Sequence, residues 1–207
     1  MPASTLEFIP KDRIQLAQDI ENYFDKLWPL NRSLMGTDYR RSLDILNEVM
    51  PTNNLEFRTG EKVLDWTVPN EWNARDAYII APNGKKIANF KDNNLHLVGY
   101  SIPFRGKLAL AELKEHLYTL PSQPDAIPYI TSYYKERWGF CISQREYDGL
   151  EEGEYDVVVD TSLEPGKLVV GEARIKGQTN REILVSSYLC HPSLANNELS
   201  GPLVLSF

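Results

Sequence analysis

Residues 183–201 read ILVSSYLCHPSLANNELSG and carry the strongest structural signal in the chain. The stretch begins with Ile183-Leu184-Val185, a continuous apolar run that leads directly into residues 186–189. A continuous run, in place of an alternation of apolar and polar residues, is typical of a strand buried on both faces. We therefore expect a central strand here, in an α/β sheet covered by helices. The runs 157–159 and 168–170, on either side of a turn at 164–166, are expected in the same core sheet.

A polar loop follows this strand and enters an apolar segment at Leu203, which we expect to form a helix. Ligands of α/β sheets bind beyond the carboxyl ends of the strands. The loop brings His191, Asn197, Glu198 and Ser200 to that place. Neutral imidazole and carboxylate groups bind zinc, and two metal ions about 3.5–4 Å apart can activate water for attack on a carbonyl. The loop therefore gathers residue types that can bind a metal ion.

This loop resembles the metal-binding segment of zinc aminopeptidases of the aminopeptidase Y type. In that family a metal-binding His follows a central strand, and an Asp in a pattern like Asn-Asp-Asn-x-Ser-Gly bridges two zinc ions. His191 matches the His, and residues 196–201 match the second element. The expected bridging Asp falls on Asn197, whose neutral amide is a weaker zinc ligand. Either Glu198 supplies the carboxylate, or the site holds one metal ion, or the site is degenerate; the sequence leaves these alternatives open.

Three further segments make the resemblance more specific. The chain resembles a bacterial aminopeptidase-like family that is often encoded near surface-polysaccharide genes. That family has a Cys-His-Pro-Ser loop, matched by residues 190–193, and segments that resemble residues 65–72, 97–101 and 120–129. The resemblance covers nearly the whole chain. It implies an aminopeptidase Y-type zinc peptidase fold that carries an inserted domain of unknown function, with this chain as the N-terminal part only.

The resemblance also implies a function and a set of site residues. The metal ligands would be His191 with Asn197 or Glu198, and the centre would hold one or two zinc ions. We expect no catalytic residue within this chain, because the general-base Glu of the resembling enzymes lies further along and is expected beyond Phe207. The apolar ending, residues 203–207, leads us to expect a chain that stops inside a helix.

These features predict an N-terminal fragment of a zinc-dependent aminopeptidase-like hydrolase. The intact enzyme would cleave peptide or amide bonds of small substrates with metal-activated water, and the fragment alone would be inactive. The alternative is a catalytically degenerate peptidase fold that serves as a binding module for peptide or surface-polysaccharide-related ligands.

The remaining sequence predicts helices and a β-rich insertion. Apolar residues recur at helical spacing from Asp12 to Pro29 and from Thr37 to Met50. Asn83-Gly84 between two strand-like runs indicates a hairpin, and leucines at 110, 113 and 117 predict a short helix.

We expect an α/β fold with a mixed sheet and helices, built from three consecutive segments. Residues 1–62 would begin a partial zinc-aminopeptidase-like core, residues 63–149 would form an inserted β-rich domain, and residues 150–207 would continue the core.

The composition limits the partners of the protein. The 207 residues include 22 basic and 29 acidic side chains, for a net charge of −7. This balance argues against nucleic acid and anionic membranes as partners, and no apolar stretch approaches the roughly 20 residues of a membrane helix. Two cysteines, and a Met1–Pro10 segment unlike a signal peptide, favour a cytoplasmic location. The sequence leaves a homo-oligomer open.

Three other sets of residues are expected to be structural. Cys190 beside His191 invites comparison with a thiol protease, but neighbours on a strand point to opposite faces, so Cys190 should face the core. His96 and His116 stand alone and should be satisfied by neighbouring groups or by solvent. The aromatic residues of the middle segment are expected to pack a small core rather than line a groove; these are Trp66, Trp72, Tyr78, Tyr100, Tyr129, Tyr133, Tyr134 and Trp138.

Overall fold

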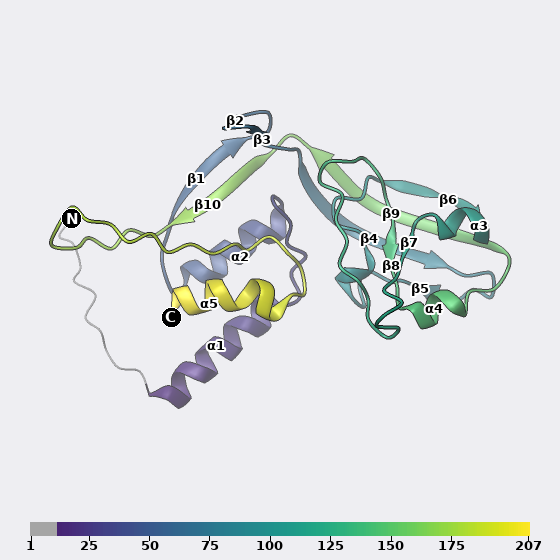
Figure 1. Cartoon of the computed structure of the whole chain (residues 1–207), viewed down its shortest axis with the longest axis horizontal. Coiled ribbons are helices and arrows are strands. Elements are labelled where there is room, and N and C mark those ends of the chain that lie inside the picture. Colours follow the sequence, from purple (N-terminus) through teal and green to yellow (C-terminus); the bar gives the residue numbers. More distant parts are fainter. Residues whose placement is uncertain (1–11) are drawn as a thin grey trace. The chain divides into compact units, whose positions relative to one another are not determined.

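The computed structural model describes residues 12–207, and the Met1–Pro10 segment considered above lies outside this range. The chain divides into two compact units (Figure 1). The described residues up to Phe57 and residues Val169–Phe207 form the first, which we call the helical unit. Residues Arg58–Leu168 form the second, which we call the sheet unit. The expected fold class, a mixture of helices and sheets, is confirmed.

Both predicted N-terminal helices are present in the helical unit. Helix α1 spans Arg13–Leu27, and the Asp12 side chain caps it by accepting a hydrogen bond from the Ile14 backbone at 3.0 Å. Helix α2 spans Thr37–Asn47 and begins after Gly36, whose φ of 149° is a conformation that favours glycine. The apolar spacing that predicted these helices also creates the faces that they bury.

A third helix, α5 (Ser200–Ser206), packs against both α1 and α2, between which Figure 1 draws it. The helix expected from Leu203 is therefore present, and it begins three residues earlier. The paired strands β1 (Asn53–Arg58) and β10 (Lys167–Glu172) complete the unit. The Tyr39 hydroxyl of α2 donates to the Val169 carbonyl at 2.8 Å. The buried core consists of Leu27, Leu30, Leu43, Leu46, Val169, Leu189, Leu199 and Leu203.

The strand expected at residues 183–189 is not formed. Ile183 and Leu184 are 92% and 91% exposed, and no strand within residues 12–207 pairs with this segment. A strand forms when its N–H and C=O groups find a neighbouring strand, and an apolar run alone does not supply one. The prediction of a strand buried on both faces is therefore wrong for the chain as described.

The sheet unit is built on four strands in the order β5-β4-β9-β6, each antiparallel to its neighbours. Their bounds are β4 Glu71–Ile80, β5 Lys86–Ile87, β6 Phe104–Ala109 and β9 Glu154–Glu164. The Asn83-Gly84 hairpin between β4 and β5 is confirmed, with Gly84 at a φ of 82°. Val157 and Val159 of β9 are 0% and 2% exposed, so the central strand forms the core of this unit.

Short elements complete the sheet unit. They are β2 Lys62–Val63, β3 Trp66–Thr67, η1 Asn94–His96, α3 Leu110–Lys114, β7 Leu117–Tyr118, β8 Phe140–Cys141 and α4 Gln144–Asp148. β2 pairs with β3, and β7 pairs with β8. The expected helix from Leu110 is shorter than its leucine spacing indicated, because Leu117 already belongs to β7.

The boundaries between the two units differ from the expected 62/63 and 149/150. They fall at 57/58 and 168/169, so residues 150–168 belong to the sheet unit. The reason is that β9 pairs along its length with β4 and along its first half with β6. The runs 157–159 and 168–170 consequently lie in separate sheets, since β10 pairs with β1.

Aromatic residues pack the sheet unit, as expected. Trp72 and Tyr100 are each 3% exposed and stack with ring centroids 5.7 Å apart. Trp138 stacks on Phe104 at 4.2 Å. Tyr134 is the exception, because its side chain is exposed. These contacts support the core interpretation over a substrate groove.

The two isolated histidines of this unit have structural partners. His96 is buried, with Nδ1 2.8 Å from the Cys141 carbonyl. His116 has Nδ1 3.1 Å from the Trp138 carbonyl and stacks on the Trp138 ring at 3.7 Å. Both imidazoles are thus accounted for by packing and hydrogen bonding.

Gly139 offers a direct test of this packing. A Cβ at this position would lie 2.8 Å from the His116 carbonyl oxygen and 2.8 Å from a Tyr118 ring carbon. We predict that Gly139→Ala lowers the free energy of unfolding by about 1–3 kcal/mol, because the backbone must shift. Gly177→Ala is the control, since a Cβ there meets no atom within 4 Å. Urea unfolding midpoints of both variants measure the difference; equal midpoints would contradict the packing described here.

Candidate metal centre

The loop that carries His191 is held at both ends by the core of the helical unit. Leu189 before it and Leu199 after it are both buried in that core. Residues Ala195–Leu199 form one π-helical turn, in which the Leu199 N–H donates to the Leu194 carbonyl at 3.3 Å. Such turns hold one residue more than an α-helical turn and are frequent at functional sites. The turn directs the Glu198 side chain inward, where it is 1% exposed.

Glu198 makes two hydrogen-bond contacts with His191. Its Oε1 accepts from the His191 backbone N–H at 2.7 Å, and its Oε2 lies 2.9 Å from the His191 ring nitrogen Nδ1. An ionised carboxylate only accepts hydrogen bonds, so Nδ1 must carry the proton. A carboxylate on one ring nitrogen is the usual way in which proteins orient a histidine that binds metal through the other.

Cys190 lies beside the same ring. Its Sγ is 3.9 Å from His191 Nε2, and the side chain is half-buried. The expectation that Cys190 faces the core assumed a strand, but residues 190 and 191 do not belong to one, so their side chains need not alternate. Ligand atoms of Cys190, His191 and Glu198 all lie within 4.8 Å of one another.

The charged neighbours of His191 favour its protonated form. Hydrogen bonding to Cys190, and then to Glu198, raises the pKa of His191 to about 10, against the lowering effect of burial. A metal ion at Nε2 would therefore displace a proton, as metal binding to histidine generally does.

Asn197 does not join this cluster. Its side chain is exposed within the π-helical turn, one position before the buried Glu198. Asn197 is not the cap of that turn either, because Leu194 stands at the cap position. Ser200 is structural, since its hydroxyl donates to the Asn196 carbonyl at 2.6 Å.

Arg32 is a component of the site that the sequence did not reveal. It is 1% exposed, its Nε donates to the His191 carbonyl at 3.1 Å, and a terminal nitrogen donates to the Leu27 carbonyl. Burial lowers the pKa of Arg32 to about 10, while electrostatic interactions with Glu198, Asp38 and Cys190 oppose that shift. Arg32 precedes His191 by 159 positions, and a single arginine between two helices carries no sequence signal for this contact.

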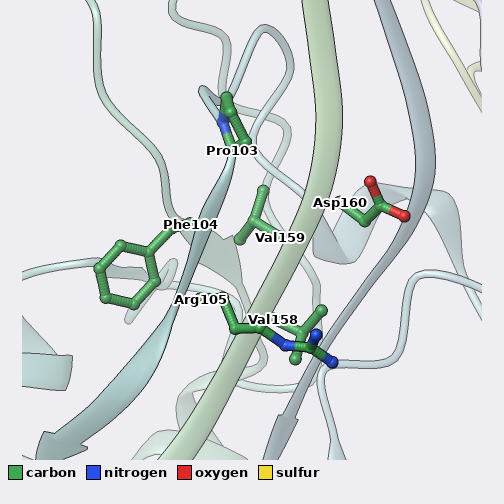
Figure 2. A pocket seen from close by; sticks show the side chains of 6 residues that line it. All are labelled: Pro103, Phe104, Arg105, Val158, Val159 and Asp160. Carbon is green, nitrogen blue, oxygen red and sulfur yellow. The ribbon is translucent and has the colours of Figure 1, made fainter.

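The sheet unit has a surface pocket of its own, with a volume of about 390 Å³. It is lined by Pro103, Phe104, Arg105, Val158, Val159 and Asp160, from the start of β6 and the middle of β9 (Figure 2). Figure 2 shows the Phe104 ring on one side and the charged ends of Arg105 and Asp160 toward the other. Asp160 is already paired with Arg75. The pocket lies at the edge of the sheet, where β6 is the outermost strand, and we assign it no functional role.

Comparison with known proteins agrees with parts of the sequence analysis. Residues 71–162, which lie within the sheet unit, match the family model described as domain of unknown function DUF2172. No helix within residues 12–207 is long and apolar enough to cross a membrane.

Two relatives from Clostridium acetobutylicum resemble most of the chain. One is named "Putative polysaccharide biosynthesis protein with aminopeptidase-like domain" and is 46% identical over 189 residues, which are 91% of this chain and 44% of that protein. The other is a crystal structure of a "putative peptidase" with a TM-score of 0.90 and 44% identity, covering 93% of this chain and 46% of that one. The chain thus matches the DUF2172 model over residues 71–162, is similar to proteins described as peptidase-like, and spans less than half of their length.

Arg32 should be essential for the stability of the loop. We predict that Arg32→Ala lowers the free energy of unfolding by about 2–4 kcal/mol, since one buried and one partly buried carbonyl each lose a charged donor. The matched control is Arg41→Ala, which removes an exposed arginine of α2 and should change stability by less than about 0.5 kcal/mol. Chemical denaturation of the two variants gives the comparison, and similar losses in both would count against the buried role.

Proposed function

We propose that this chain is the N-terminal part of a zinc-dependent aminopeptidase-like hydrolase, in which His191 binds zinc and Glu198 orients it. The full-length enzyme would act on peptide or amide bonds of small substrates. The names of the two relatives support the peptidase class, and their greater length supports further site residues outside this chain.

The observation that carries the proposal is the two-point contact between Glu198 and His191. A buried carboxylate is costly unless it is fully hydrogen-bonded, and here both of its oxygens are used on one histidine. This arrangement fixes the ring and directs Nε2 away from Glu198. The donor types, imidazole nitrogen with carboxylate support, fit zinc.

The geometry argues against one of the alternatives that the sequence left open, a bridging carboxylate from Glu198. Because both oxygens of Glu198 are engaged by His191, we assign Glu198 a positioning role rather than that of a bridging ligand. Asn197 is exposed and neutral, so we assign it no ligand role. The remaining ligands and the general-base Glu would come from residues beyond Phe207.

Zinc, when bound, would supply activation of water and polarisation of the substrate carbonyl. Within this chain, His191 would hold the ion and give up its Nε2 proton on binding. Glu198 would keep the proton on Nδ1 and the ring in place. Arg32 would fix the backbone carbonyl of His191 and balance the buried carboxylate.

Metal content of the full-length protein tests these roles. We predict that His191→Ala abolishes stoichiometric zinc binding, and that Glu198→Gln weakens zinc affinity by about 10–100-fold because the ring loses its support. Glu182→Gln is the matched control, since Glu182 is an exposed glutamate of the same unit, and its affinity should equal that of wild type. Circular dichroism checks that each variant folds. Equal zinc in wild type and His191→Ala would refute the ligand assignment.

Activity of the full-length protein separates catalysis from binding. We expect hydrolysis of aminoacyl-arylamides that a chelator abolishes and added zinc restores. The binding-module alternative is favoured by one observation, the neutral Asn197 at the position of the expected bridging Asp. A metal-free and inactive full-length protein that still binds a peptide or a polysaccharide-related ligand would support that alternative.

A further inference from the structure

We propose that Cys190 supplies a thiolate ligand to the metal ion held by His191, so that this chain contributes a sulfur–nitrogen ligand pair. The inference rests on the proposed function, because it concerns the same metal ion. It adds a ligand whose type changes the metal preference of the centre.

The spacing of the two donor atoms fits a shared ion. Zinc lies about 2.3 Å from a thiolate sulfur and about 2.0–2.1 Å from an imidazole nitrogen. In tetrahedral geometry these bond lengths place the sulfur and the nitrogen about 3.5–3.6 Å apart. The Cys190 Sγ to His191 Nε2 distance is 3.9 Å, which is close to that separation.

The three side chains of the cluster are close together. Glu198 Oε2 lies 2.9 Å from Nδ1 of the ring, and Cys190 Sγ lies 3.9 Å from Nε2. Ligand atoms of Cys190, His191 and Glu198 lie within 4.8 Å of one another, so the thiol is a neighbour of an ion bound to this histidine.

The electrostatic surroundings can tolerate a thiolate. The buried Arg32 guanidinium donates from Nε to the carbonyl of His191, the residue after Cys190, at 3.1 Å. Arg32 and the bound cation would together balance the charges of Cys190 and Glu198. On binding, the ion would displace one proton from the thiol and one from Nε2, both released to solvent.

A sulfur ligand would determine which metal ions the centre prefers. Thiolates select soft or borderline ions such as zinc, whereas magnesium, calcium and manganese prefer oxygen ligands. The full-length protein should accordingly retain zinc or cobalt in the presence of excess magnesium.

Cobalt substitution tests the sulfur ligand directly. In full-length protein loaded with Co²⁺, a bound thiolate gives a charge-transfer band in the near ultraviolet. We expect this band in wild type and in the control Cys141→Ala, since Cys141 is a free, buried thiol of the sheet unit. We expect its loss in Cys190→Ser. Cobalt content is measured in each sample.

The outcomes distinguish this inference from the proposed function. Stoichiometric cobalt without a charge-transfer band in wild type, or a band that persists in Cys190→Ser, overturns the sulfur ligand and leaves the role of His191 intact. Absence of any bound metal overturns both proposals.

A second measurement needs no variant. Wild-type full-length protein is alkylated with and without zinc, and the modified cysteines are located by peptide mass mapping. Zinc should protect Cys190, and a chelator should remove the protection. Equal alkylation of Cys190 in the zinc-loaded and chelated protein would also overturn the inference.

Discussion

The buried carboxylate of Glu198 imposes the constraint on which the whole loop depends. Its side chain is removed from solvent, so it must find donors, and it finds two of them on His191, seven residues earlier. This pairing requires the chain to fold back on itself, which the π-helical turn at Ala195–Leu199 accomplishes. The position of the Cys190 sulfur and the Arg32 contact to the His191 carbonyl follow from the same fold-back.

The family match and the cluster of metal-binding groups lie in different units. The match to the domain of unknown function lies entirely within the sheet unit. His96 and His116 of this unit are fixed by packing and hydrogen bonds. The cluster of metal-binding groups lies in the helical unit, within the loop that resembles zinc aminopeptidases. The sheet unit is accordingly best described as an insertion with its own aromatic core, and the proposed metal chemistry belongs to the host.

Local patterns explain which predictions succeeded. The helices from Arg13 and Thr37 and the hairpin at Asn83-Gly84 depend on spacing, capping and turn residues that lie close together in the sequence. The strand at 183–189 failed for a non-local reason: a strand needs a partner, and none of the described strands pairs with that segment. The reason given for an inward Cys190 failed with it, since that reason assumed the alternation of side chains in a strand.

The sequence by itself determined the α/β class, the position of the polar loop and the candidacy of His191 and Glu198, because composition, periodicity and motif spacing are local properties. Only the tertiary structure showed that Asn197 is exposed and Glu198 is buried against His191, since the π-helical turn exposes one side chain and buries the next. Only the tertiary structure brought Arg32 to the loop across 159 positions. Burial and hydrogen bonding between distant residues depend on how the chain packs, and no short stretch of sequence encodes them.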